Sequence, residues 1–453
     1  MKILHINTYD KAGGAEQFAF DFVHQDFTTE KYQKYFDENN EKIETKFIVK
    51  RKKTDSPKVE ALPRPLSSHF LEKFDKGIYK LFKHTFFSDL SVLKKLHFTF
   101  ENLQKNEFYQ NADVIHLHNI HYDFFDLNDL IKISKQKPII WTLHDMWAMT
   151  GGEAYTFENE NYKKGIGKTP YQAFHPLLNP IIDRRQNYLE QKKRIYFAIN
   201  QLKGNEKHNF VFVPVSNWLK ECLEASYIYP NKTENQEVEK NISIQTIQNG
   251  IDTTIFKNLN QRNWNTKRIL FFNSDNPYKG AALFETLLPQ LNQQTDTIFE
   301  LFVVGKELSK TVLHSFSNTS KIKITHLKPI YDRQKMNELY NSVDILVFPS
   351  RAENFSLLVL EAMAAGIFII GSTAGGIKEQ LANQRGILFE NENQKDLLYK
   401  INLVLNMSLE EIREKGKTAS LFVNENWSVE KMRLKYLKLY HQILNDGLDL
   451  VDG

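Results

Sequence analysis

The chain has 453 residues, of which 41% are hydrophobic and 25% charged, and these ordinary values exclude a disordered, collagen-like or coiled-coil protein. The 59 Lys and Arg against 55 Asp and Glu leave a net charge of +4, too small to indicate a nucleic-acid-binding protein. One cysteine, Cys222, excludes an internal disulfide and a cysteine-based zinc site. No apolar run reaches the ~18 residues that span a bilayer, and the first residues do not resemble a signal peptide. The sequence therefore predicts a cytoplasmic protein of two or three domains.

Short apolar runs rich in Val, Ile and Phe recur along the chain, and most are followed by a turn and a helical pattern. The runs are Ile3–Ile6, Val114–Leu117, Ile139–Leu143, Phe210–Val215, Ile269–Phe272, Leu301–Val304, Ile345–Phe348 and Phe368–Ile370. Because they lack a two-residue alternation, they are typical of strands buried on both faces, as in a parallel sheet covered by helices. Helical periodicity is clearest at Phe18–Val23, Gln334–Ser342, Ser356–Ala365 and Gln394–Asn406. These βαβ units predict a doubly wound α/β protein.

The predicted strands fall into two sets, and polar segments without apolar periodicity lie between the sets. We therefore predict an N-terminal domain over residues 1–262, a C-terminal domain over 263–425, and a C-terminal helix and tail over 426–453. Within the last segment, Ser428–Leu444 has apolar residues at helical spacing and Ser428 as its N-cap, which predicts a long amphipathic helix.

Residues 50–105 combine 13 Lys and Arg with 6 Asp and Glu, a net charge of +7, and carry eight interleaved Phe and Tyr residues. Helices that pack the rings inward and leave the lysines solvated would explain this composition. An amphipathic face on an anionic membrane surface would explain it as well, since each basic residue near such a surface contributes ~1 kcal/mol. Both interpretations stay open, and no RNA-binding motif accompanies the charge.

The segment Val343–Glu361, VDILVFPSRAENFSLLVLE, combines a buried strand, a loop and the start of a helix. Backbone N–H groups at Asn354–Leu358 are predicted at the helix start, where they can hold a phosphate or sugar oxygen. Glu353 and Glu361 are predicted at the C-terminal edge of the sheet, where carboxylates can accept hydrogen bonds from vicinal hydroxyls. On the spacing alone, an ordinary surface Glu and an ordinary helix Glu of a βα unit are the favoured explanation.

Glu353 and Glu361, in the setting PSRAENFSLLVLEAMAAG, resemble the motif of the retaining glycosyltransferases of the family-four type. Further motifs occur in that family's order and cover nearly the whole chain: KAGGAE (11–16), DVIHLHN (113–119), TLHDMW (142–147), VSNWL (215–219), QNGIDTTIF (248–256), YKG (278–280), LYNSVDILVFPS (339–350) and STAGGIKE (372–379). The resemblance implies the GT-B fold, in which two Rossmann-like domains face each other across a cleft and a C-terminal helix returns to the N-terminal domain. This ordered set favours a functional interpretation of the Glu pair.

The resemblance implies roles for residues of the C-terminal domain. Glu361 would bind the ribose hydroxyls of a nucleotide sugar. Glu353 would face the donor sugar and the departing phosphate, and Lys279 would neutralise the diphosphate as charge develops on it. Backbone groups that would complete the donor site, at the base, the sugar and the phosphates, belong to Ile330, Asn354, Phe355, Ser356 and Leu357.

In the N-terminal domain, Gly13 and Gly14 follow the first strand, where a backbone without side chains can approach the diphosphate or the acceptor and two N–H groups can form an anion nest. Glu16 would either favour the helix start or contact the acceptor, and the sequence leaves both open. The resemblance places His144 in the interdomain cleft, in contact with the donor sugar. The catalytic residues implied are His144, Lys279 and Glu353.

Three histidines, His116, His118 and His121, form an H-x-H-x2-H cluster of the kind that can bind a metal. No further carboxylate motif supports zinc, and the resemblance implies neither a metal nor a cofactor besides the nucleotide sugar as co-substrate.

The chain departs from the family pattern in two places. Many relatives carry an Arg five residues before the Lys, where this chain has Ser274, so one diphosphate contact is missing or comes from elsewhere, with Arg351 as the candidate. Relatives that share TLHDMW commonly carry several cysteines in the following insertion. Residues 151–168 have none, so other side chains must hold this loop.

The sequence thus predicts a retaining, metal-independent glycosyltransferase that moves a hexosyl group from a nucleoside diphosphate sugar to an acceptor hydroxyl. A second carboxylate for a covalent intermediate is lacking, because Glu361 is assigned to ribose, so the leaving phosphate would take the acceptor proton. The acceptor would be a saccharide or lipid-linked saccharide of surface polysaccharide synthesis, with peripheral contact at the inner face of the membrane and no nucleic acid partner. The alternatives are a nucleotide-sugar epimerase or hydrolase of the same fold and a catalytically silent binding subunit of a polysaccharide machine.

Overall fold

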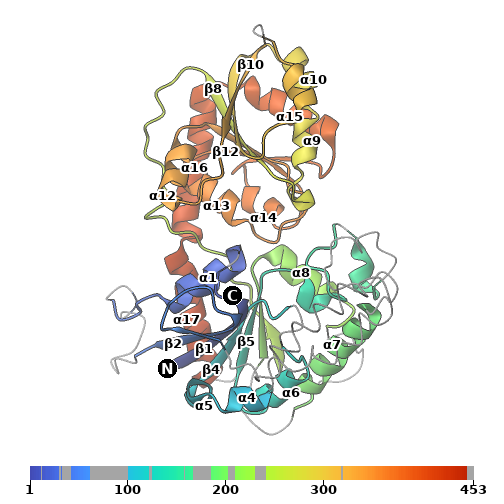
Figure 1. Ribbon diagram of the computed structural model, residues 1–453, viewed down its shortest axis with the longest axis vertical. Helices are drawn as coiled ribbons and strands as arrows, with labels where there is room; N and C mark the ends of the chain where they lie inside the picture. Colours follow the sequence, from blue (N-terminus) through green and yellow to red (C-terminus); the bar gives the residue numbers. More distant parts are fainter. Residues whose placement is uncertain are drawn as a thin grey trace. The chain divides into compact units, whose positions relative to one another are not determined.

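The computed structural model describes residues 1–11, 13–29, 32, 42–61, 100–121, 125–157, 159–166, 185–202, 210–229, 241–317 and 320–445. The chain divides into two compact units. The N-terminal unit comprises Met1–Val215, Leu219–Ile247 and the chain from Arg433, and the C-terminal unit comprises Ser216–Trp218 and Gln248–Met432. Each unit is a parallel sheet with helices on both of its faces (Figure 1).

The sheet of the N-terminal unit has seven parallel strands in the order β3-β2-β1-β4-β5-β6-β7. The strands are β1 (Lys2–Tyr9), β2 (Glu44–Arg51), β3 (Val59–Ala61), β4 (Val114–Leu117), β5 (Ile139–Leu143), β6 (Phe210–Pro214) and β7 (Ile242–Ile244). The order reverses between β1 and β4, as in the doubly wound Rossmann-like fold. Loops at the carboxyl ends of the strands beside such a reversal are where ligands bind in open α/β sheets.

Helices connect these strands and cover the sheet. They are α1 (Gly14–Val23), α4 (Phe100–Gln104), α5 (Glu107–Asn111), α6 (Asp129–Ser134), α7 (Arg185–Asn200), α8 (Asn217–Ala225) and the 3-10 turns η3 (Trp147–Met149) and η4 (Glu160–Lys163). Helix α1 buries Phe22, whose ring meets Tyr436 and Tyr440 of α17 (Val429–Asn445) edge-on. Helices α1 and α17 therefore pack together on one face of this sheet.

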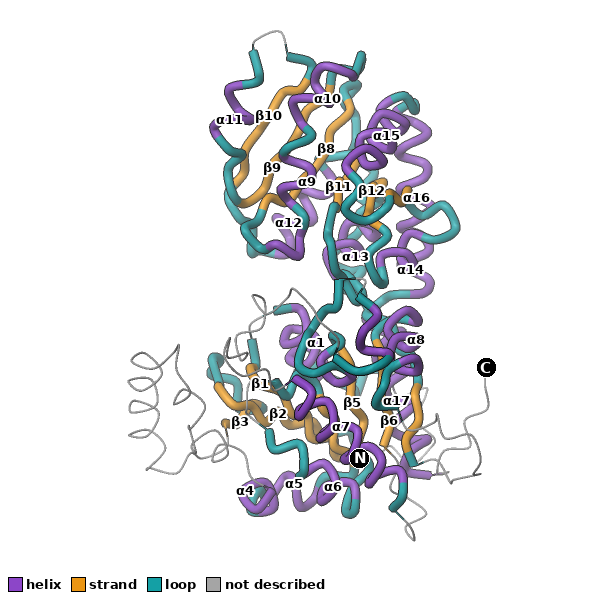
Figure 2. Tube along the Cα trace, turned by 90° about the vertical axis from the view of Figure 1, so that its right-hand side faces the viewer, coloured by secondary structure: helices purple, strands orange, loops and turns teal. Residues whose placement is uncertain are grey.

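The C-terminal unit has six parallel strands in the order β10-β9-β8-β11-β12-β13, which is the same reversal pattern. Figure 2 shows β10, β9, β8, β11 and β12 following one another in this order. Its strands are β8 (Lys267–Asn273), β9 (Phe299–Gly305), β10 (Ile322–Leu327), β11 (Ile345–Phe348), β12 (Phe368–Ser372) and β13 (Ile387–Phe389). Its helices are α9 (Ala281–Glu285), α10 (Leu288–Gln294), α11 (Lys310–His314), α12 (Arg333–Asn341), α13 (Leu357–Ala364), α14 (Ile377–Leu381), α15 (Gln394–Leu405) and α16 (Leu409–Asn426), with the 3-10 turn η7 (Pro277–Lys279).

The apolar runs of the sequence become central strands of these sheets. In β11, Ile345 pairs with Ile269 of β8 on one side and with Phe368 of β12 on the other, and all three side chains are buried. They belong to one apolar core that also contains Phe284 of α9 and Leu397 of α15. The two-sided burial explains why these strands lack a polar alternation. The predicted doubly wound α/β class is confirmed in both units.

Helix α17 belongs to the N-terminal unit from Arg433 onward, although it follows the whole C-terminal unit in the chain. Its phenols hold it against the sheet: the hydroxyl of Tyr440 lies 2.6 Å from Nδ1 of His116, and the hydroxyl of Tyr436 lies 2.8 Å from Oγ1 of Thr142. The predicted return of the C-terminal helix to the N-terminal domain is therefore confirmed, and Oγ of Ser428 accepts a hydrogen bond from the Lys431 amide at 3.3 Å, as expected of its N-cap.

The two units divide at residue 247, earlier than the predicted domain boundary at 262. The difference arises because an irregular segment is tied to helix α12 by side chains. The amide of Lys257 donates to Oδ1 of Asn337 at 3.1 Å, and the amide of Leu259 donates to Oδ1 of Asn341 at 2.8 Å. Arg262 then donates to the carbonyl oxygens of three residues of the same unit. Polar contacts of this kind leave no apolar periodicity in the sequence.

Among the described residues, no helix is both long and apolar enough to cross a bilayer. Most of the basic aromatic segment 50–105 lies outside the described residues, which resume at Phe100 after Ala61. The membrane-facing and inward-packing interpretations of that segment therefore both stay predictions.

Candidate active site

Several predicted donor-site residues of the C-terminal unit follow strands at one edge of its sheet. Lys279 follows β8, Ile330 follows β10 and Glu353 follows β11. Gly375, of the STAGGIKE motif, follows β12. Because all six strands are parallel, their carboxyl ends meet at the same edge. The fold thus gathers at one edge residues that are up to about a hundred positions apart in the chain.

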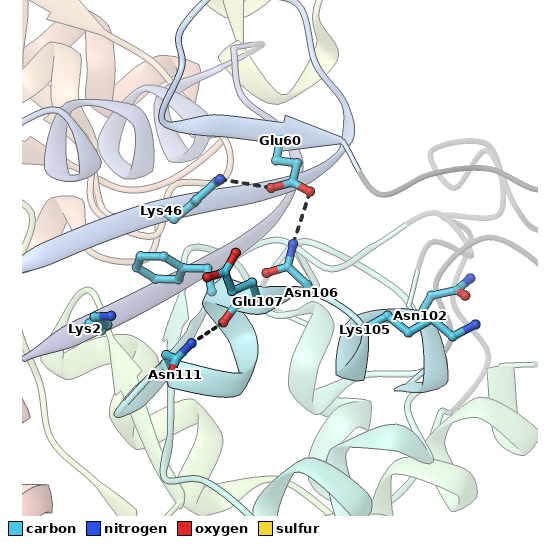
Figure 3. Close-up of a pocket in the computed structure, with 9 residues that line it drawn as sticks. Lys2, Lys46, Glu60, Asn102, Lys105, Asn106, Glu107 and Asn111 are labelled. Atoms are coloured by element: carbon cyan, nitrogen blue, oxygen red, sulfur yellow. Dashed lines mark hydrogen bonds and ion pairs between the residues drawn. The ribbon is translucent and has the colours of Figure 1, made fainter.

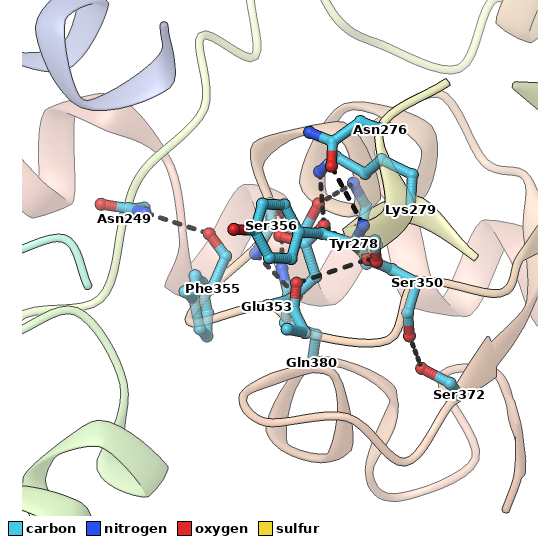
Figure 4. A network of polar contacts seen from close by, with 12 residues as sticks. Asn249, Asn276, Tyr278, Lys279, Ser350, Glu353, Phe355, Ser356, Ser372 and Gln380 are labelled. Atoms are coloured by element: carbon cyan, nitrogen blue, oxygen red, sulfur yellow. Dashed lines mark hydrogen bonds and ion pairs between the residues drawn. The ribbon is translucent and has the colours of Figure 1, made fainter. Parts of the chain in front are cut away.

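Lys279 and Glu353 form an ion pair at the centre of a polar network (Figure 4). Nζ of Lys279 lies 2.6 Å from Oε1 of Glu353, and the same oxygen accepts a hydrogen bond from Oγ of Ser350 at 3.0 Å. The Glu353 side chain is 8% exposed, whereas that of Lys279 is 42% exposed. The buried carboxylate of Glu353 therefore fixes the position of the Lys279 ammonium group, and the solvent-exposed side of that group can bind an anion.

Two glycines bring these loops into contact. Gly280, of the YKG motif, has a φ of +63°, and a Cβ on it would lie 1.9 Å from the carbonyl oxygen of Pro349. Gly375, of the STAGGIKE motif, has a φ of +51°, and a Cβ there would lie 1.9 Å from the carbonyl oxygen of Glu353. Any side chain at either position would push a loop away from the ion pair, because both neighbours are backbone atoms.

The start of helix α13 is less open than its sequence predicts. The amide of Ser356 donates to Oε1 of Gln380 at 3.0 Å, and Nε2 of Gln380 donates back to the Ser356 carbonyl at 2.8 Å. Oγ of Ser356 caps the amide of Val359, and the carbonyl of Phe355 accepts from Nδ2 of Asn249 at 3.1 Å. Ser356 thus cannot offer a free N–H to a phosphate without displacing Gln380, and its part in the predicted amide cradle stays a prediction.

Glu361 lies on α13 and faces helix α12. The hydroxyl of Tyr340 donates to Oε2 of Glu361 at 3.1 Å. Burial raises the pKa of Glu361 to about 7, although the hydrogen bond from Tyr340 and the charge of Arg333 oppose this shift. Ile330 precedes the same helix α12, so the structure brings the predicted base and ribose contacts to one helix. No hydrogen bond or ion pair among the described residues joins Glu361 to Lys279 or Glu353.

The glycine pair of the N-terminal unit starts helix α1. Gly14 is the first residue of the helix, and the amide of Gly13 donates to Oε2 of Glu16 at 2.9 Å. This contact is the carboxylate half of a capping box. The Gly13 N–H is therefore paired within the chain by Glu16 at the helix start, and an anion would have to displace the Glu16 carboxylate to reach it, so the anion nest stays a prediction.

The predicted histidine cluster divides into two groups. His116 and His118 meet His5 of β1, and one ring nitrogen from each of these three buried side chains lies within 4.8 Å of the other two. His121 instead lies 3.5 Å from Oδ1 of Asp145 and packs against the Trp147 ring. His5 could not be identified from the sequence, because its partners come from another strand. Its register pairing with His116 puts both side chains on one face of the sheet.

His144 follows β5 and takes part in the same cluster. Its Nε2 lies 3.2 Å from Nδ1 of His118, and the ring of Phe18 packs edge-on against it at 5.2 Å. Burial lowers the pKa of His144 to about 3. The next residue, Asp145, has its pKa raised to about 7 by burial. His144 is therefore a neutral group near pH 7 and not an imidazolium.

A buried lysine holds the loop that follows TLHDMW. Nζ of Lys192 on α7 donates to the carbonyl oxygens of Trp147 and, at 2.8 Å, of Thr150, and it lies 3.8 Å above the Trp147 ring. Arg185 adds an ion pair to Glu153 at 3.0 Å. These two side chains fasten the cysteine-free loop that follows TLHDMW. Lys192 lies on the buried face of α7 between Leu189 and Ile195, and that position among apolar neighbours is the sequence signal that identifies it.

Ser274 stands where many relatives were expected to carry an arginine, and Arg351 is the predicted substitute for it. Oγ of Ser274 accepts the amide of Asn276 at 3.1 Å, so this residue shapes the loop before Lys279. Arg351 pairs with Glu392 at 2.5 Å, and its Cγ would lie 3.4 Å from a Cβ on Gly280. Arg351 is thus next to the Lys279 loop, and its supply of a second diphosphate contact stays a prediction.

A polar pocket of about 500 Å³ lies away from these residues, near the amino ends of β1 and β2 (Figure 3). Its lining residues are Lys2, Lys46, Glu60, Asn102, Lys105, Asn106, Glu107, Phe108 and Asn111. Glu60 accepts from Nζ of Lys46 and from Nδ2 of Asn106, both at 3.1 Å. The pocket is therefore bridged by its own side chains and contains none of the predicted site residues.

Comparison with known proteins identifies the C-terminal unit. Residues 252–420 match the family model of the glycosyl transferases group 1. The C-terminal unit therefore carries a glycosyl transferases group 1 domain. The chain is 22% identical to WcaC of Escherichia coli strain K12, whose name assigns it as a glycosyl transferase to colanic acid biosynthesis, over 84% of this chain and 94% of WcaC.

The fold of the chain resembles solved structures over nearly its whole length. Sucrose-phosphate synthase of Thermosynechococcus elongatus aligns with a TM-score of 0.58 at 15% identity and covers 98% of both chains. Anabaena HepE, solved in complex with UDP and glucose, aligns with a TM-score of 0.55 at 16% identity over 97% of this chain and 99% of that chain. Identities this low show the fold alone, and that fold confirms the predicted GT-B type.

Proposed function

We propose that this protein transfers a sugar from a nucleoside diphosphate sugar to an acceptor hydroxyl with retention of the anomeric configuration. The observation that carries this proposal is the exposed ammonium group of Lys279, which the buried carboxylate of Glu353 holds at the carboxyl edge of the C-terminal sheet. A cation fixed in advance stabilises the negative charge that develops on a departing diphosphate. The UDP and glucose in the related HepE fold support a nucleotide sugar as the donor.

The remaining donor contacts follow from the same edge of the sheet. Glu361 is assigned to the ribose hydroxyls, since a carboxylate oxygen beside the Tyr340 phenol has capacity for further donors. Ile330, before α12, is assigned to the base. From the N-terminal unit, we assign His144 to the donor sugar and the Gly13–Gly14 backbone to the diphosphate or the acceptor.

The arrangement of the carboxylates favours a route without a covalent intermediate. Such an intermediate needs two carboxyl groups ~5–5.5 Å apart across the scissile bond, one of which acts as nucleophile. Glu361 is assigned to ribose, and Oε1 of Glu353 is occupied by Lys279 and Ser350. We therefore propose same-face attack, in which the acceptor hydroxyl gives its proton to the leaving phosphate oxygen and Lys279 stabilises the diphosphate, without a metal or a cofactor.

The acceptor is proposed to be a saccharide in polysaccharide biosynthesis, because WcaC is named for that process. A lipid-linked acceptor would place the enzyme at the inner face of the membrane. The net charge of +7 on residues 50–105 supports such a peripheral contact with anionic lipid.

Substitutions at Lys279 and Glu361 test the donor site. We expect Lys279→Ala to lower kcat by about 100-fold or more, as for the loss of one preorganised charge-stabilising group, and Glu361→Ala to raise the KM for the donor. Lys323→Ala is the matched control, since this exposed lysine on β10 lies 3.9 Å from Glu300 and outside the proposed site. Parental rates in both site variants would contradict the assignment.

The donor can be identified by a thermal-shift screen of UDP-, GDP- and ADP-sugars, because a ligand that binds the folded state raises its stability. Incubating the donor that binds without any acceptor separates the alternatives. An epimerase or hydrolase converts the donor alone, and a silent binding subunit converts nothing with any acceptor. Transfer in the presence of EDTA is expected to continue at the same rate.

A further inference from the structure

Three histidines from neighbouring strands of the N-terminal sheet form a continuous hydrogen-bonded chain. His5 lies on β1, His118 follows β4, and His144 follows β5, three strands that are adjacent in the sheet. Nδ1 of His5 lies 3.0 Å from Nε2 of His118, and Nδ1 of His118 lies 3.2 Å from Nε2 of His144. Each link thus joins the Nδ1 of one ring to the Nε2 of the next.

The orientation of the rings shows that both links are directed hydrogen bonds. The ring centres are 5.3 Å apart for His5 and His118 and 5.5 Å apart for His118 and His144. Both separations exceed the corresponding N···N distance by 2.3 Å, about two ring radii, so each bond lies along the line between ring centres. The ring planes differ by 8° and 25°, which keeps the nitrogen lone pairs near the plane of the link.

The number of protons in this chain is fixed because its rings are neutral. Burial lowers the pKa of His5 and of His144 to about 3, and burial together with the neighbouring histidines lowers the pKa of His118 well below its ordinary value. A neutral imidazole carries one N–H and one lone pair. Two of the three N–H groups fill the two links. The third lies at one end of the chain, either on Nε2 of His5 or on Nδ1 of His144.

The two ends of the histidine chain, Nε2 of His5 and Nδ1 of His144, are not equivalent. His5 is 0% exposed, and its Nε2 meets no hydrogen-bond partner within the described part of the chain. His144 is only half-buried. A buried N–H without an acceptor is less favourable than a buried lone pair without a donor. The third N–H is therefore placed on Nδ1 of His144, with every hydrogen bond of the chain pointing toward that residue.

We propose that His5 and His118 are positioning residues that hold His144 in the Nδ1–H tautomer, so that His144 presents a hydrogen-bond donor and not a general base. His5 donates from Nδ1 to His118, and His118 donates from Nδ1 to Nε2 of His144. The use of this tautomer rests on the proposed function: a contact from His144 to the donor sugar is then an N–H that points at a sugar oxygen. In this tautomer His144 cannot act as a general base through Nδ1, because this nitrogen has no lone pair with which to take the proton of the acceptor hydroxyl.

His116 lies against the chain without belonging to it. Its Nδ1 meets the hydroxyl of Tyr440 at 2.6 Å and its Nε2 meets Oγ1 of Thr142 at 2.7 Å. Its ring centre is 4.7 Å from that of His5 and 4.3 Å from that of His118. His116 is equally buried, so His116→Gln is a matched control for the removal of a histidine from this part of the core.

The test reads the tautomers directly. Two-bond ¹H–¹⁵N correlation spectra of histidine-labelled protein distinguish Nδ1–H from Nε2–H rings, and single substitutions assign the signals. Free histidine prefers the Nε2–H form, so Nδ1–H forms at His5, His118 and His144 near pH 7 are a specific signature. We expect His5→Asn to keep that signature at His118 and His144, because the amide N–H replaces the donor. His5→Leu should lose it, and His116→Gln should leave it unchanged.

Three results would overturn the proposal. They are an Nε2–H or imidazolium signal for His144 in the parent protein, an unchanged His144 signal in His5→Leu, and a stoichiometric zinc ion whose removal shifts the signals of His5, His116 and His118. None of these measurements requires a nucleotide sugar or enzymatic turnover. If the tautomers are as expected and His5→Leu still transfers sugar at the parental rate, the histidine chain stands and the assignment of His144 to the sugar fails.

Discussion

The protonation of Glu361 gives a quantitative test of the ribose assignment. Burial raises its pKa to about 7, so the carboxyl group is largely protonated at pH 6 and largely ionised at pH 8. An ionised carboxylate accepts hydrogen bonds from both ribose hydroxyls, whereas the protonated form has lost part of its acceptor capacity. Donor binding should therefore strengthen as the pH rises through 7.

The size of the effect follows from the pKa. If only the ionised form binds, the Kd of the donor at pH 6 is about tenfold higher than at pH 8. Glu361→Gln keeps the size of the side chain and cannot titrate, so its Kd should be higher than that of the parent at pH 8 and flat across this range. Asp145 and Lys192 also have pKa values near 7, but both remain in the variant, and the difference between the two proteins isolates Glu361.

Isothermal titration calorimetry with an intact nucleotide sugar is the suitable assay. A nucleoside diphosphate alone is unsuitable, because its terminal phosphate titrates with a pKa of about 6. The reasoning is refuted if the Kd of the parent protein does not change between pH 6 and pH 8, or if Glu361→Gln shows the same slope as the parent.

Three further predictions concern neighbouring groups. Gly375→Ala should destabilise the fold by more than about 1 kcal/mol in chemical denaturation and lower transfer, because its Cβ would lie 1.9 Å from the carbonyl of Glu353 at a positive φ; a neutral result would contradict the close packing. The pKa of Lys192 is lowered to about 7 by burial, so the unfolded chain binds more protons between pH 7 and pH 10 and the stability of the parent should rise over that range relative to Lys192→Met. A constant difference would exclude the shift. Tyr340→Phe removes the hydrogen bond that lowers the pKa of Glu361, so the midpoint of the pH dependence of nucleotide-sugar binding should move to higher pH. An unchanged midpoint would contradict this contact.

The central strands could be predicted from the sequence, whereas the edge strands could not. The apolar runs at β4, β5 and β11 have the predicted bounds, because two-sided burial demands continuous Val, Ile and Phe. In contrast, β10 at the edge of its sheet has the sequence IKITHL and buries only its first side chain fully. Strands β2, β3, β7 and β13 were not predicted either. All four lie at or next to a sheet edge, where one side needs no apolar cover.

Contacts between distant segments explain what the sequence could not show about the site. The helix start at Ser356 was predicted, but the amide that should have been free is taken by Gln380, 24 residues later. The hydrogen-bonded chain through His118 depends on His5, 113 residues earlier, whose own surroundings in the sequence show only an ordinary strand. Local patterns predict where a helix or strand lies, and the partners of its polar groups come from elsewhere in the fold.

The two carboxylates of the family motif illustrate how such partners decide the chemistry. Glu353 meets Lys279, 74 residues earlier, and Glu361 meets Tyr340, 21 residues earlier. A bound diphosphate would share the ammonium group with Glu353, so its phosphate oxygens compete with that carboxylate for one cation. Ribose hydroxyls would instead add donors to Glu361 and favour its ionised form. One ligand is thus expected to have opposite effects on two Glu side chains eight positions apart. The diphosphate competes with Glu353 for its cation, whereas the ribose hydroxyls give Glu361 additional hydrogen bonds.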